Sequence, residues 1–139
     1  MADMKGVFMA HGKIAISTRA KLAMVDITSD ITSVIRSEVL VNGVIFLFNP
    51  HTTAGLTINE GADPAVQDDI VAVLKKIIPF DHPYRHMEGN SPAHIMASLM
   101  GSSATVFIEN GRLVLGTWQK IFFCEFDGPR SRKVIWKLL

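Results

Sequence analysis

Three histidines lie in polar surroundings that would let a fold bring them together. His51 follows the apolar run of residues 44–48, and His86 and His94 bracket the polar segment of residues 87–93. Neutral imidazole is the commonest side chain that binds a transition metal near neutral pH. Three histidines with an open water position would make a catalytic-type zinc site. The alternative is that they are surface loop residues, because the spacing of His86 and His94 matches no standard metal motif.

Two carboxylates near these histidines could orient the ligands or act as a general base, namely Glu60 and Glu88. Glu60 is followed by Asp63, for which the simpler interpretation is the N-cap of a helix. The two roles can coexist, because a helix N-terminus also attracts anions.

Two short segments could contact a substrate. Ser102 and Ser103 follow Gly101, and their amides and hydroxyls could hold a phosphate, although an ordinary turn explains them better. Trp118 offers a flat apolar wall, and Gln119 offers a donor and an acceptor. A lone tryptophan lies more often in a core or an interface, so the structural role is favoured.

The C-terminal third adds two cations and the single thiol of the chain. Arg130 and Arg132 could hold an anion with fork geometry, whereas Arg132 fits a surface charge at a turn at least as well. Cys124 lies in a strongly apolar run, which predicts a buried small hydrophobe. A lone cysteine forms no internal disulfide and suits a reducing, cytoplasmic compartment.

Bulk composition restricts the classes of protein that the chain can belong to. The 139 residues fit one domain, which we assign to residues 1–139. A net charge of +1 leaves no basic excess for nucleic acid or an acidic membrane surface. Residues 1–13 lack a signal-peptide core, and no apolar run has the length of a membrane span. An apolar content of 48% makes an oligomer a reasonable expectation.

The first half of the chain alternates strand and helix signals. Residues 13–17 and 21–25 predict two strands or one bent pair, and a helix capped by Thr28 or Ser29 runs toward Glu38. The pair Asn42-Gly43 could be a hairpin turn or the left-handed stop of that helix, and the helical period favours the stop. Residues 44–48 predict a buried strand, and residues 56–58 predict another.

The clearest helix covers residues 64–78, with Asp63 at its N-cap and Pro64 at its first position. Residues 80–91 predict a loop and residues 92–100 a short helix. Four strands follow at residues 104–108, 112–115, 120–126 and 133–138, with a hairpin turn at Asn110-Gly111 and a turn at Gly128-Pro129 before the last strand. We expect an α+β fold, a mainly antiparallel, sandwich-like sheet with two or three helices packed on it.

Three segments in order resemble the signatures of the YjbQ-type family, the secondary thiamine-phosphate synthases. The first is HTTAGLTINE at residues 51–60 with Ala-Asp-Pro at 62–64, and the second is His86 with residues 88–90 and 92–94. The third comprises residues 111–121 and 125–130. The resemblance runs from about Thr28 to the C-terminus, and Lys120 is a small departure because glycine is commoner there in the family.

The resemblance implies a compact α/β domain, usually a homotrimer, with a zinc site at His51, His86 and His94. It also implies that an aminopyrimidine diphosphate and a thiazole phosphate are joined with release of pyrophosphate. On this basis we assign catalytic roles to Glu88, Glu60 and Arg130. The residues expected to bind the small phosphorylated substrate are Thr52, Asn90, Ser102, Ser103, Trp118 and Gln119.

The metal that three histidines favour is not the metal that the implied reaction usually needs. Coupling a diphosphate ester usually relies on magnesium, whereas three histidines suit zinc and activated water. We rank the transferase first. A zinc-dependent hydrolase of a small phosphorylated or acylated metabolite is second, and a non-enzymatic, trimeric metal- or metabolite-binding protein is third.

Overall fold

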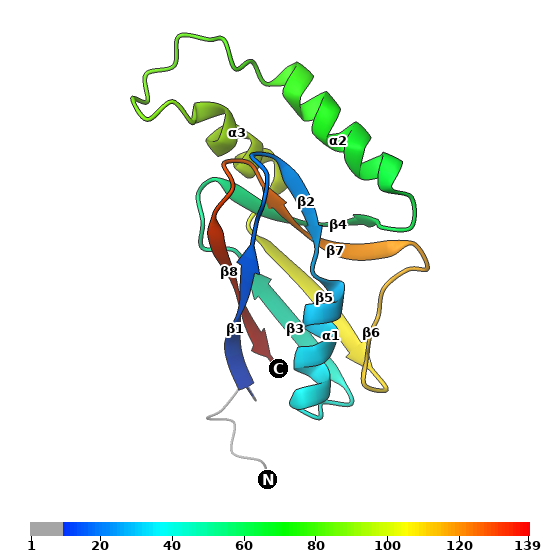
Figure 1. The fold of residues 1–139 in the computed structure, drawn as a ribbon. Helices are drawn as coiled ribbons and strands as arrows, with labels where there is room; N and C mark the ends of the chain where they lie inside the picture. The colour runs from blue at the N-terminus through cyan, green and yellow to red at the C-terminus, as the bar shows by residue number, and fades with distance from the viewer. Residues whose placement is uncertain (1–9) are drawn as a thin grey trace.

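The computed structural model describes residues 10–139 (Figure 1). The expectation about residues 1–13 therefore falls mainly on residues outside this part of the chain. In chain order the elements are β1 (Ala10–Ser17), β2 (Ala23–Asp26), α1 (Thr28–Ser37), β3 (Gly43–Phe48), β4 (Ala54–Glu60), α2 (Pro64–Ile77), α3 (Ser91–Met100), β5 (Ser103–Glu109), β6 (Arg112–Leu113), β7 (Gln119–Glu125) and β8 (Ser131–Leu138).

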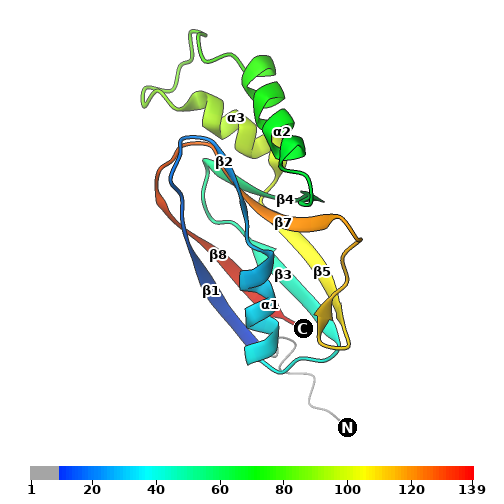
Figure 2. The same cartoon turned by 45° about the vertical axis from the view of Figure 1, so that its right-hand side comes forward.

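Two antiparallel sheets form the body of the fold. One has the strand order β1-β8-β3-β5-β6, and the other has the order β2-β7-β4. A hydrophobic core lies between them and includes two buried side chains of α1, Ile31 and Ile35. Figures 1 and 2 both show α2 and α3 together at one end of the sheets. The predicted α+β fold with helices on a largely antiparallel, two-sheet body is confirmed.

Strand β7 is covered on both faces, which explains its continuous run of apolar residues. Ile121 and Phe123 belong to the core between the sheets, whereas Phe122 and Cys124 pack with Met96 of α3 in a second apolar cluster. Alternate side chains of a strand point to opposite faces, so both faces of β7 are buried. Burial raises the pKa of the Cys124 thiol to about 12, and the prediction of a buried cysteine is confirmed.

Helix α2 starts as the sequence predicts. The Asp63 carboxylate accepts a hydrogen bond from the Ala65 amide, and Pro64 occupies the first turn, where its missing N–H costs nothing. The apolar side chains of this helix are only partly packed, because no residue of α2 is buried and Val73 and Ile77 are 54% and 60% exposed. No helix within residues 10–139 has the length and apolar character needed to span a bilayer.

The predicted start and stop of α1 are both wrong in detail. Neither Thr28 nor Ser29 caps the helix; the Asp26 carboxylate accepts from the Thr28 amide, while the Thr28 hydroxyl accepts from the amide of Ile121. The left-handed residue after the helix is Val39, with a φ of 53°, rather than the Asn42-Gly43 pair. The Thr28 hydroxyl therefore accepts a hydrogen bond from β7 and does not cap its own helix.

Two predictions about strands need correction. The run at residues 44–48 is buried on one face only, because Phe46 and Phe48 lie on the uncovered face of the larger sheet and are 38% and 49% exposed. The predicted strands at residues 120–126 and 133–138 do not share one sheet, because β7 and β8 belong to different sheets. The hairpin at Asn110-Gly111 is confirmed, with φ values of 52° and 72° at its two turn residues.

Candidate functional site

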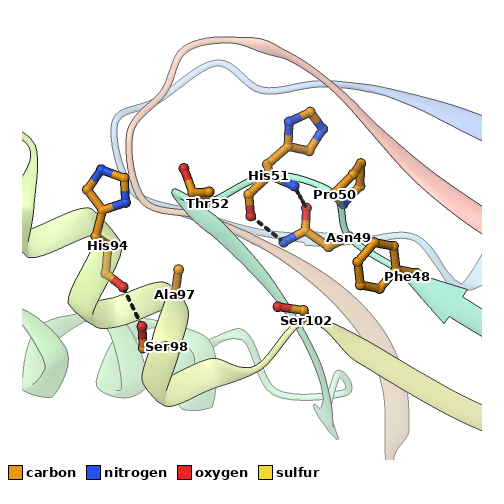
Figure 3. Close-up of a pocket in the computed structure, with 9 residues that line it drawn as sticks. All are labelled: Phe48, Asn49, Pro50, His51, Thr52, His94, Ala97, Ser98 and Ser102. Atoms are coloured by element: carbon orange, nitrogen blue, oxygen red, sulfur yellow. Dashed lines mark hydrogen bonds between the residues drawn. The ribbon is translucent and has the colours of Figure 1, made fainter.

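A buried asparagine shapes the turn that carries His51. Asn49, which is 2% exposed, donates from Nδ2 to the carbonyl oxygens of His51 and Ala54 at 3.2 and 2.6 Å. Its Oδ1 accepts from the His51 amide at 3.0 Å. Figure 3 shows the two hydrogen bonds between Asn49 and His51, with Thr52 lying between His51 and His94 in that view. The chain after β3 is therefore held in one conformation by side-chain-to-backbone bonds.

The His51 ring is held as a neutral imidazole in one tautomer. Its Nε2 accepts the backbone N–H of Lys133 in β8 at 2.9 Å, so the proton of the neutral ring resides on Nδ1. Burial, and next the positive charge of Arg132, lower the pKa of His51 below 6.5. At neutral pH this side chain is thus a donor through Nδ1.

His94 belongs to the first turn of α3, in agreement with the short helix predicted over residues 92–100. Its ring packs edge to face against the ring of His86, with centroids 5.1 Å apart. His86 Nε2 lies 3.9 Å from the Glu88 carboxylate, and both of those side chains are largely exposed. The segment before α3 and the first turn of α3 therefore bring an imidazole pair and a carboxylate together.

Two hollows meet at the histidines. They have volumes of about 440 and 320 Å³ and share the residues Pro50, His51, Thr52 and His94. The larger one is completed by Phe48, Asn49, Ala97, Ser98 and Ser102, shown in Figure 3. The smaller one is completed by Thr53, Glu88, Asn90, Asp127, Arg130 and Arg132. One hollow is thus partly apolar, and the other is lined by charged and amide side chains.

Asp127 organises one wall of the smaller hollow. Its Oδ2 accepts from Asn90 Nδ2 and from Arg130 Nη2, each at 3.0 Å. Burial alone raises the pKa of Asp127, but these hydrogen bonds and the charge of Arg130 outweigh it and lower the pKa. Asn90 Oδ1 is buried without a hydrogen-bond partner among residues 10–139. This wall therefore retains an acceptor that lacks a donor.

Arg132 is a buried member of the site, so its prediction as a surface charge is wrong. It is 8% exposed, donates from Nε and Nη2 to the two carboxylate oxygens of Glu125, and donates from Nη2 to Thr53 Oγ1 at 2.8 Å. Glu125 is fully buried and also accepts from the Thr18 hydroxyl at 2.7 Å. Burial raises the pKa of Glu125, but the bonds from Arg132 and Thr18 outweigh it and lower the pKa.

Sequence reasoning missed the roles of Glu125, Asp127 and Thr53. A signal existed for the first, because a glutamate that ends the apolar strand at residues 121–126 needs a partner if it is buried. No local signal marked Thr53, since only the fold places it beside Arg132.

Five of the predicted site residues line neither hollow, namely His86, Glu60, Ser103, Trp118 and Gln119. In the pairing of β4 with β7, Ala54 lies opposite Glu125 at one end and Glu60 opposite Gln119 at the other. Six residue steps along a strand cover about 20 Å, so Glu60, Gln119 and the adjacent Trp118 are remote from the histidines. Ser103, the first residue of β5, is exposed and lines neither hollow, whereas Ser102 lines the larger one.

The three predicted histidine ligands do not form a metal site. Within residues 10–139 the structure forms no group of three histidine, cysteine or carboxylate side chains that could hold an ion. His51 uses its Nε2 lone pair to accept the Lys133 amide, and its other nitrogen carries the proton. The prediction of a site built from His51, His86 and His94 is therefore wrong.

The lowered pKa of His51 predicts a pH dependence of stability. As the pH falls below 6.5, the unfolded chain binds a proton at this residue before the folded chain does, so the free energy of unfolding decreases. We expect denaturant titrations between pH 7.5 and pH 5 to show a smaller decrease for H51Q than for the wild type. His82→Gln, which removes a loop histidine, is the control, and an unchanged slope in H51Q would contradict the assignment.

Comparison with known proteins identifies the family. The family model for the UPF0047 protein YjbQ-like group matches residues 12–139. YugU of Bacillus subtilis is 45% identical over 91% of this chain and 96% of its own length, and a UPF0047 protein of Methanocaldococcus jannaschii is 48% identical over 91% and 92%. A crystal structure of a YjbQ/UPF0047 protein from Clostridium acetobutylicum superposes with a TM-score of 0.89 at 50% identity, covering 91% of this chain and 98% of its own.

These relatives overturn the predicted reaction. They are described only as UPF0047 proteins or as an uncharacterized conserved protein, and none carries a thiamine-phosphate synthase activity in its description. The predicted transferase was placed at a three-histidine metal site that the structure does not form. The zinc hydrolase and the metal-binding form of the third alternative relied on the same site and are wrong with it, whereas metabolite binding did not depend on a metal. What remains is the family itself: the chain belongs to the UPF0047, YjbQ-like family.

Proposed function

We propose that the chain binds a small polar metabolite with one phosphate or carboxylate group across the two hollows, and that His51 and His94 handle protons on it. The observation that carries this proposal is the fixed tautomer of His51. A neutral imidazole whose Nε2 is held by a backbone amide presents Nδ1–H to a ligand as a donor of defined direction. The proposal needs no metal, in keeping with the donor set.

The smaller hollow supplies side chains that can bind the phosphate or carboxylate group of the ligand. Arg130 uses Nε and Nη2 on Asp127, which leaves its remaining N–H groups for a ligand. Thr52 adds a hydroxyl to the same wall. Arg132 is already paired with Glu125 and Arg130 with Asp127, and Glu88 adds a further carboxylate. The hollow therefore suits a ligand that carries donors, such as hydroxyl or amine groups, as well as one anionic group. Asn90 Oδ1 is an acceptor for such a donor.

The larger hollow suits the body of the same molecule. Phe48 and Ala97 line it together with Ser98 and Ser102, so apolar contact and hydroxyl hydrogen bonds are both offered. Because both hollows include His51 and His94, a ligand that filled them would pass between the two imidazoles. That placement supports proton transfer at a central atom of the ligand, with His86 and Glu88 linking His94 to solvent.

The test is a binding screen by NMR in the presence of a chelator, with a panel of phosphorylated and carboxylated metabolites. We expect a ligand that shifts the amide signals of Thr52 and His94 and binds about tenfold more weakly to R130Q. H51Q and H94Q should lose turnover of that ligand, and H82Q should behave as the wild type. Absence of any shift at these amides, or equal affinity for R130Q and the wild type, would reject the proposal.

The predicted homotrimer, the zinc or magnesium cofactor and the cytoplasmic location stay predictions. Phe46, Phe48 and Phe107, which are exposed on the uncovered face of the larger sheet, support an oligomer of some kind. Because Phe48 also lines the larger hollow, a subunit packed on that face would lie beside the ligand.

A further inference from the structure

A separate hollow of about 430 Å³ lies between α1 and the β5–β6 hairpin and shares no residue with the two hollows at the histidines. Figure 1 shows α1 next to β6. Thr28, Thr32 and Arg36 line it from the helix, and their spacing of four residues places them in one stripe. Arg112 and Asn110 line it from the hairpin. Two elements distant in sequence therefore contribute to one space.

Its charge is of one sign. Among residues 10–139, Arg36 and Arg112 are the only charged residues that line it. The ion pairs within residues 10–139 are those of His86, Arg130 and Arg132, so neither arginine has a carboxylate partner there. Arg36 also lies in the last turn of α1, where a positive charge complements the helix dipole. The dipole does not explain Arg112, which belongs to the hairpin. Two arginines thus border one hollow without a carboxylate in ion-pair contact, although Glu109 lies opposite Arg112 in the β5–β6 pairing.

Uncharged groups in the hollow complete a ligand site. The Thr28 hydroxyl accepts from the Ile121 amide at 2.8 Å, so its own O–H is left to donate. The side chain of Asn110 lines the same space, and its backbone amide is already bound by Asn42 Oδ1 at 3.3 Å. Leu113 supplies apolar surface. The hollow therefore combines cations, a free hydroxyl and an apolar wall.

We propose that this hollow is a second ligand site, which binds a phosphate monoester with an apolar substituent. Paired guanidinium groups match the oxygens of a phosphate dianion and remain charged at every physiological pH. The Thr28 hydroxyl adds a donor, and the apolar substituent packs on Leu113. The site is independent of the histidine hollows and does not rest on their proposed function.

The test is an NMR titration at low ionic strength with phenyl phosphate and inorganic phosphate as probes. Thr32 and Gly111 amides report this site, while Thr52 and Asn90 amides report the histidine hollows. We expect phenyl phosphate to bind more tightly than inorganic phosphate, and R36Q and R112Q each to weaken it about tenfold at the Thr32 and Gly111 signals.

Two controls distinguish a site from general charge. R19Q removes one exposed cation elsewhere, and R130Q removes one from the histidine hollows; neither should alter the titration of Gly111. Dispersed spectra of R36Q and R112Q confirm folding. Unshifted Thr32 and Gly111 signals, or an equal loss of affinity in R19Q, would overturn the proposal.

Discussion

Replacing Arg132 with methionine is expected to lower the free energy of unfolding by about 3–5 kcal/mol, because it leaves a buried carboxylate without its partner. Glu125 is fully buried and receives both of its charge-assisted bonds from that guanidinium. Urea denaturation at pH 7 measures the loss. Thr53 would also lose a hydrogen bond on the floor of the smaller hollow.

Arg130→Met provides the matched control, because Arg130 is 54% exposed and its pair with Asp127 is worth about 0–1 kcal/mol. The double variant E125Q/R132M should be more stable than R132M alone, since it no longer buries a lone charge. A loss below about 1 kcal/mol in R132M would show that the pair is not buried as described.

Gly128→Ala is expected to destabilise the protein by about 3 kcal/mol through overpacking. A Cβ at this position would lie 2.2 Å from the backbone oxygen of Ala20 and 2.9 Å from Thr18 Oγ1. A backbone oxygen cannot rotate away as a side chain can. The Gly128 amide also donates to Lys21 O at 3.0 Å, which ties the two loops together. Thermal or urea unfolding measures the effect.

Gly116→Ala is the control for that change, because the nearest atom to its Cβ would be the Gln119 side-chain oxygen at 3.3 Å, which can move. We expect a change of about 0.5 kcal/mol or less there. Shifted amide signals at Asp127 and Arg130 in G128A would show that the loop holding the ligand-binding arginine has moved. Equal stability of the two variants would contradict the close approach of the loops.

Local sequence was sufficient where a short segment sets its own conformation. The Asn110-Gly111 turn, the Asp63–Pro64 start of α2 and the loop at residues 80–90 follow from backbone preferences and capping, which act over a few residues. The α+β class followed from the order of the elements. Residue types in the segments around His51, His86 and His94 also placed several candidate residues in the histidine hollows.

Pairing between distant strands determined which of the predicted residues lie near the histidines. Opposite ends of the β4–β7 pair separate Glu60 and Gln119 from the histidines, and strand register has no local signal. The start of β8 brings the Lys133 amide to His51, which fixes the tautomer and removes the lone pair that a metal would need.

The sequence by itself determined which segments become strands, helices and turns, and it identified the family by its motifs. The tertiary structure alone decided the electrostatics, because charge state depends on what surrounds a group in space. The sequence around Arg132 is compatible with a surface cation. In the structure, the pairing of β8 in the larger sheet buries this side chain against Glu125. The hollow between Arg36 and Arg112 likewise exists only because α1 packs beside the β5–β6 hairpin, which is distant from it in the sequence.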